Sequence, residues 1–140
     1  MPTQGELPEI RKTIVIQAPI EKVWKAVSTS EGIAGWWMAN TFEPIVGHEF
    51  ILHAEQYGDS SCQVTELNLL NRVGFNWGKD WHLTFELKSL DGGTEVTLIH
   101  SGWDADKVTE FGQPHTVVRG FMDGGWEKIV KKRLPSYLEA

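Results

Sequence analysis

The sequence predicts an α+β fold in which an antiparallel sheet packs against a long C-terminal helix, and two observations support this prediction. Between positions 47 and 100, short segments with two-residue hydrophobic alternation follow one another, separated by turn residues, as in antiparallel strands. From Pro114 onward the hydrophobic period changes to three and four residues, which is typical of an amphipathic helix. The chain shows no repeat, low-complexity segment or linker, so we expect one domain over residues 1–140, with a flexible segment at 1–9.

The N-terminal part predicts one strand and two short helices. Ile10–Gln17 is rich in alternating β-branched residues, and Pro19 ends this strand because it lacks the N–H that a sheet ladder needs. Residues 21–27 carry a helical apolar stripe. Capping residues at 28–30 then begin a second helix over Glu31–Gly35, which its two glycines keep short.

The middle of the chain predicts a run of strands. In chain order they cover Thr41–Pro44, Gly47–Gln56, Cys62–Leu69, Val73–Trp77, His82–Lys88 and Thr94–His100. Asp91-Gly92-Gly93 is a strong hairpin signal between the last two. In the fifth strand, apolar residues alternate strictly with polar ones, which indicates a sheet with one buried and one polar face.

The last predicted element is a long helix from Pro114 to about Leu134, which Pro135 kinks or ends. Its apolar stripe is wide enough to lie along a sheet. Three glycines, Gly120, Gly124 and Gly125, are unfavourable inside a helix. Two explanations stay open: the glycines allow close packing against strands, or they leave space for a ligand.

Composition excludes several classes of protein. No apolar stretch is long enough to cross a membrane, and the N-terminus lacks the pattern of a signal peptide. A net charge of −6 argues against nucleic-acid binding. Cys62 is the only cysteine, which fits a reducing compartment, and we expect a cytoplasmic protein. His48 and His53 do not share a strand face, so we expect no metal and no cofactor.

The seven tryptophans are distributed over nearly every predicted element. Each brings about 150–250 Å² of surface that can be buried. They indicate either a very aromatic core or a core hollow enough to need large side chains as walls. Trp36, Trp37, Trp81 and Trp103 lie at element ends, where a position at the rim of a cavity and a position in the core are equally consistent with the sequence.

The order of elements and several short motifs resemble a known family. The motifs are Ile16-Gln17-Ala18-Pro19-Ile20-Glu21-Lys22-Val23-Trp24, Gly35-Trp36-Trp37, Val64-Thr65-Glu66, Gly92-Gly93-Thr94-Glu95-Val96-Thr97-Leu98, His100-Ser101-Gly102-Trp103 and Gly124-Gly125-Trp126. They resemble the START-like superfamily, also called SRPBCC, and within it the branch named after the activator of heat-shock-protein-90 ATPase. The resemblance covers roughly Ile10 to Leu138 and is specific for the fold, whereas members of the superfamily differ in function.

The resemblance implies a helix-grip fold, a curved sheet of six to seven strands around the C-terminal helix, with a cavity between them. Alternation then selects the residues that line the cavity. The expected ligand-binding residues are Phe50, Leu52, Val64, Glu66, Phe75, Trp77, Leu83, Phe85, Leu98, His100, Met122 and Trp126, and Val96 and Ile129 share their orientation.

Glu66 and His100 are the two titratable residues of this wall, and they are the candidates for catalysis. Our first hypothesis is a binding protein for a small hydrophobic or aromatic molecule, acting as carrier, sensor or stress-response accessory. The second is an enzyme of the cyclase or hydratase kind that transfers a proton through Glu66 or His100. The third is a chaperone-associated interaction domain with a protein partner. We expect a non-enzymatic monomer or weak homodimer that binds neither nucleic acid nor membranes.

Overall fold

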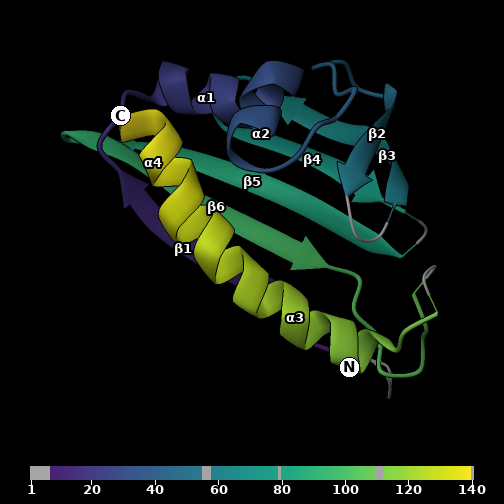
Figure 1. Cartoon of the computed structure of the whole chain (residues 1–140). Helices are drawn as coiled ribbons and strands as arrows, with labels where there is room; N and C mark the ends of the chain where they lie inside the picture. The colour runs from purple at the N-terminus through teal and green to yellow at the C-terminus, as the bar shows by residue number, and fades with distance from the viewer. Residues whose placement is uncertain (1–6, 55–57, 79, 110–111, 140) are drawn as a thin grey trace.

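The computed structural model describes residues 7–54, 58–78, 80–109 and 112–139 (Figure 1). The strands are β1 Ile10–Ile16, β2 Glu49–Ala54, β3 Gly58–Asn68, β4 Arg72–Trp77, β5 Trp81–Leu90 and β6 Gly93–Ser101. The helices are α1 Ile20–Ser28, α2 Ser30–Trp36, α3 His115–Lys128, the π-helical turn η1 Ile129–Arg133 and α4 Leu134–Glu139.

The six strands form one antiparallel sheet in the order β1-β6-β5-β4-β3-β2. From β2 to β6 each strand pairs with its neighbour in the chain, as short turns between antiparallel strands allow. β1, the first strand, pairs with the last, so that Ile10 lies opposite His100. The α+β class and the helix-grip arrangement predicted from the sequence are therefore confirmed.

Helices α1 and α2 cover one end of the sheet, and the C-terminal helices cross in front of it (Figure 1). Pro19 precedes α1 with extended backbone, as a residue at a helix start does. Between the two helices, the side chain of Thr29 accepts a hydrogen bond from the backbone N–H of Gly32 at 3.0 Å. This N-cap turns the chain directly from α1 into α2.

One face of the sheet forms the core and the other is largely polar. The core face carries buried apolar side chains from all six strands; among them are Ile16, Leu52, Val64, Val73, Phe75, Leu83, Phe85, Val96 and Leu98. Rings from α2 and the following segment complete this core: Trp36 meets Phe85 edge to face at 5.6 Å, and Phe42 meets Phe50 at 5.1 Å. The expected division into a buried and a polar face is correct.

The expected strand over Thr41–Pro44 does not form. An isolated bridge joins Asn40, just before this segment, to Leu52, and the backbone N–H of Thr41 donates to the carbonyl of Ile51 at 3.0 Å before the chain bends at Pro44. The side chain of Asn40 accepts from the backbone N–H of Phe42 at 3.0 Å. Such a local side-chain bond competes with ladder formation. The expected end of the second strand at Gln56 lies outside the described residues.

Pro135 does not end the C-terminal helix. A widened turn precedes it, in which the backbone N–H of Leu134 donates to the carbonyl of Ile129. Proline has no N–H for the carbonyl four residues before it, and a π turn is one way in which a helix accommodates this loss. The chain then continues as α4, whose Leu138 is buried.

Close packing does not explain the glycines of α3. A Cβ atom at Gly120, Gly124 or Gly125 would have no atom of another segment within 4 Å. Close approach occurs elsewhere: a Cβ atom at Gly35 would overlap the ring of Tyr137 from α4. Gly120 and Gly124 are exposed, so the space beside them is solvent, whereas Gly125 is partly buried and leaves open space at the side of the helix.

Candidate functional site: a buried aromatic and histidine cluster

His100 lies on the inner face of β6, between Ile10 on β1 and Leu83 on β5. Its side chain is completely buried, as the alternation of β6 predicts. From α3, the indole Nε1 of Trp126 donates a hydrogen bond to His100 Nδ1 at 3.0 Å. This bond connects the helix to β6.

Aromatic rings surround His100 on several sides. We call the group the aromatic–histidine cluster; it consists of Trp77, Trp81, His100, Trp103, His115 and Trp126. Trp77 stacks on His100 with 5.2 Å between ring centroids, Trp81 meets it edge to face at 5.1 Å, and Trp103 lies at 4.6 Å. Contacts of this kind stabilise aromatic groups beyond their buried area.

The hydrogen bonds of His100 define its protonation state. Indole can only donate, so Nδ1 of His100 carries no proton and the neutral ring holds its hydrogen on Nε2. Burial lowers the pKa of His100 from 6.5 to about 3, and Arg119 and His115 act in the same direction. His100 is therefore a neutral donor at neutral pH.

His115, at the start of α3, has the same tautomer for a similar reason. Its Nδ1 accepts a hydrogen bond from the backbone N–H of Asp104 at 3.1 Å. Its Nε2 lies 3.4 Å from a carboxylate oxygen of Asp80. The carboxylate of Asp80 also lies 3.4 Å from the ammonium group of Lys107.

Among the described residues, Trp77 Nε1, His100 Nε2 and His115 Nε2 of the cluster make no hydrogen bond, and of these three only His115 Nε2 has a carboxylate nearby, that of Asp80 at 3.4 Å. Most buried polar groups in proteins have a partner. Other indoles here follow that rule, since Trp36 donates to the carbonyl of Ala26 at 2.7 Å and Trp103 donates to that of His100 at 3.0 Å.

Most of the expected inner residues lie together. Phe50, Leu52, Val64, Phe75, Trp77, Leu83, Phe85, Val96, Leu98, His100 and Trp126 are buried, and Met122 and Ile129 are partly buried against the same core. The position of these side chains agrees with the alternation. A ligand-binding role for them is a proposal, taken up below.

Glu66 is the exception, and its expected inward orientation is wrong. A bulge between Val64 and Glu66 inserts Thr65 as an extra residue in β3, which shifts the alternation by one. The Glu66 side chain is 41% exposed on the outer face, where Arg72 Nε donates to it at 3.1 Å. Glu66 and His100 therefore lie on opposite faces of the sheet and do not pair.

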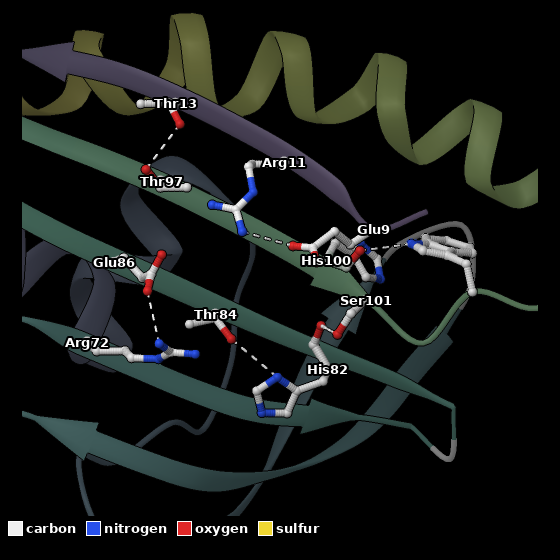
Figure 2. Close-up of polar contacts among 11 residues, drawn as sticks. Glu9, Arg11, Thr13, Arg72, His82, Thr84, Glu86, Thr97, His100 and Ser101 are labelled. Atoms are coloured by element: carbon white, nitrogen blue, oxygen red, sulfur yellow. Dashed lines mark hydrogen bonds and ion pairs between the residues drawn. The ribbon is translucent and has the colours of Figure 1, made fainter. Parts of the chain in front are cut away.

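The outer face around Glu66 carries a ladder of polar side chains. Arg72 also contacts Glu86 at 2.9 Å, and the His82 ring lies 3.2 Å from the hydroxyl of Thr84 (Figure 2). On its other side, the His82 ring lies 2.8 Å from the hydroxyl of Thr65. Cross-strand pairs of this type stabilise a solvated sheet face. We interpret this ladder as structural.

The tryptophans at element ends, for which the sequence allowed either a position at the cavity rim or one in the core, are core residues. Trp36, Trp37, Trp81 and Trp103 are all buried. Trp37 is also part of the site, because its ring lies 5.4 Å from Trp77 and 5.0 Å from Trp126. Its position after a short helix gives no periodic signal from which this role could be predicted, and the same is true of His115 after Pro114.

A surface groove of about 490 Å³ lies between the end of α2 and the C-terminal helices, with Trp37, Arg133 and Tyr137 among its lining residues. Within the described ranges, no three His, Cys, Asp or Glu side chains gather in a way that could hold a metal ion. Across the same ranges, none of the helices has the length and apolar character needed to span a membrane.

Comparisons with known proteins agree with the fold. The family model described as "Activator of Hsp90 ATPase homolog 1-like protein" matches residues 17–139. The solution structure of Bacillus halodurans protein BH1534 is 42% identical with a TM-score of 0.87, and the alignment covers 96% of this chain and 99% of that chain.

Two more distant structures share the fold. Protein MLL2253 from Mesorhizobium loti is 24% identical, with a TM-score of 0.81 over 94% of this chain and 96% of that chain. The Aha1 dimer from Colwellia psychrerythraea is 22% identical, with a TM-score of 0.76 over 95% and 97%. A search of curated proteins finds no match.

Proposed function

Since the chain belongs to the family of activator of Hsp90 ATPase homolog 1-like proteins, whose fold is compatible with ligand binding, we propose that it binds a small hydrophobic or aromatic molecule between the sheet and α3. It would act as a carrier, a sensor or a stress-response accessory. The observation that carries this proposal is the loose packing of the middle of α3 against the sheet. Between the buried Val118 and Trp126, no residue from Arg119 to Gly125 is fully buried.

The middle of α3 lies beside an apolar wall. Met122 is its one partly buried hydrophobic residue packed against the core, and methionine adapts its shape readily to a neighbouring molecule. Open space beside Gly125 adds to the room available. A ligand that displaces the Met122 side chain would enter the core beside Trp126, one turn further along α3, and the aromatic rings there supply the burial that apolar binding needs.

Proton transfer is supported less well than binding. Glu66 and His100 lie on opposite faces, so they cannot act on one substrate. His100 would then have to act as the proton-transfer group without Glu66, and its pKa of about 3 makes it a poor base at neutral pH. A cyclase or hydratase activity would show as turnover that His100→Gln abolishes without loss of binding.

The test of the proposal is a screen of hydrophobic and aromatic compounds by thermal shift, followed by NMR of the indole N–H signals. We expect binders to shift the signals of Trp77 and Trp126. Met122→Trp should fill the site and weaken binding at least tenfold. Phe121→Trp, one residue away on the exposed side of α3, is the matched control and should bind normally.

If no apolar compound shifts the indole signals of Trp77 or Trp126 in the folded protein, the proposal is wrong. Binding that Phe121→Trp weakens and Met122→Trp leaves intact would place the site on the surface instead. Co-purification with a chaperone ATPase and altered ATP turnover would support an interaction domain. Sedimentation equilibrium distinguishes the proposed monomer from a weak homodimer.

A further inference from the structure

Two N–H groups of the aromatic–histidine cluster, Trp77 Nε1 and His100 Nε2, are buried without an acceptor among the described residues and belong to rings that stack on each other. Trp77 is 5% exposed and His100 is 0% exposed, and neither Trp77 Nε1 nor His100 Nε2 has an acceptor among the described residues. The two rings stack with 26° between their planes and 5.2 Å between centroids. Since the rings are in stacking contact, one small molecule is long enough to reach both donors.

A change of tautomer cannot remove the unpaired N–H of His100. Trp126 uses Nδ1 as its acceptor, so the hydrogen of the neutral ring stays on Nε2. Indole Nε1 of Trp77 is likewise a donor only. A buried donor without an acceptor is costly, and a group that supplies the acceptor recovers that cost.

The charges nearby favour a neutral acceptor over an anion. A buried carboxylate needs a cation in contact, and Arg119, whose charge acts on His100, uses its Nε to donate to the backbone carbonyl of Pro8 at 2.9 Å. At the same end of the cluster, the carboxylate of Asp80 lies beside His115 and would repel an anion. A carbonyl oxygen, with two lone pairs and no charge, suits two neutral donors.

We propose that Trp77 Nε1–H and His100 Nε2–H form a recognition site for the carbonyl oxygen of a small apolar ligand. This inference rests on the proposed function and adds the chemical class of the ligand. Apolar walls give affinity to any hydrophobic molecule of suitable size, whereas the two donors select those that carry a neutral oxygen acceptor. A site that donates hydrogen bonds rejects analogues that lack the acceptor.

The experiment compares acetophenone with α-methylstyrene, which replaces the carbonyl oxygen by a CH₂ group of similar shape, and with benzoate as the anion. NMR titration of the wild-type protein gives each affinity. We expect acetophenone to bind at least tenfold more tightly than either analogue and to move the Trp77 indole proton downfield. Trp77→Phe should lower that preference several-fold. Trp36→Phe, which removes an indole bonded to Ala26, should leave the preference unchanged.

Equal binding of acetophenone and α-methylstyrene would overturn the carbonyl site while leaving the proposed function in place. Benzoate binding as tightly as acetophenone would also overturn it, in favour of an anion site. If none of the three compounds binds and the wider apolar screen fails as well, the proposed function falls together with this inference. If the wider screen succeeds with oxygen-free compounds alone, only the carbonyl site is refuted.

Discussion

Mild acid should destabilise the protein through His100. In the unfolded chain a histidine titrates near 6.5, whereas burial lowers the pKa of His100 in the folded protein to about 3. The unfolded state therefore takes up a proton that the folded state rejects. The resulting stability is fully present above pH 6.5 and is lost as the pH falls toward 3.

The size of this effect follows from the two pKa values. Each pH unit inside the window costs about 1.4 kcal/mol. Between pH 7 and pH 5 the free energy of unfolding should fall by about 2 kcal/mol on account of His100. His82, on the outer face, also has a lowered pKa because it is partly desolvated, and it adds to the same trend. Glu127, whose pKa is lowered by Lys12, becomes important only at lower pH.

Urea denaturation at pH 7, 6 and 5 measures the effect. His100→Gln keeps an acceptor for Trp126 and removes the titration, so its stability should change much less between pH 7 and 5. Val130→Ala, a buried residue without charge, provides a destabilised control that should retain the full pH dependence. A His100→Gln protein with the same pH dependence as wild type would refute this reasoning.

Three further predictions concern stability. Trp36→Phe should cost about 1–2 kcal/mol more than Trp77→Phe in urea denaturation, because only Trp36 loses a satisfied hydrogen bond; equal costs would contradict the assignment of Trp77 as unpaired. Gly35→Ala should lower the free energy of unfolding by about 1–3 kcal/mol, because the new Cβ overlaps the ring of Tyr137. This loss of stability should be smaller when Tyr137→Ala is also present. An equal loss in both backgrounds would show that overlap is not the cause. Gly125→Ala should stabilise by up to about 1 kcal/mol, because its Cβ meets open space; a lower thermal midpoint would disprove that.

Alternation predicted most of the inner wall because the period of a strand is strict. His100 shares its face with Val96 and Leu98, and all three are buried as expected. The same rule misplaced Glu66, since one extra residue at Thr65 reverses every later assignment in that strand. No turn residue or glycine marks the bulge in the sequence.

The contacts of Trp37 and His115 in the site could not be predicted from the sequence, for a different reason. Trp37 reaches Trp77 and Trp126 only because α2 ends where it does, and His115 joins the cluster through Asp104 in a loop without periodicity. These are contacts between distant segments. Local propensity constrains the elements, whereas the packing between them decides which side chains meet.

The pairing of β1 with β6 has a consequence for how the protein folds. Thr13 and Thr97 share a hydrogen bond across 84 positions of chain, and because pairings between distant segments form slowly, we expect this one to form late in folding. His100 lies between β1 and β5, and Trp126 reaches it only from α3, which follows β6 in the chain. The cluster is then among the last regions to assemble, and a ligand bound there should retard unfolding without accelerating refolding.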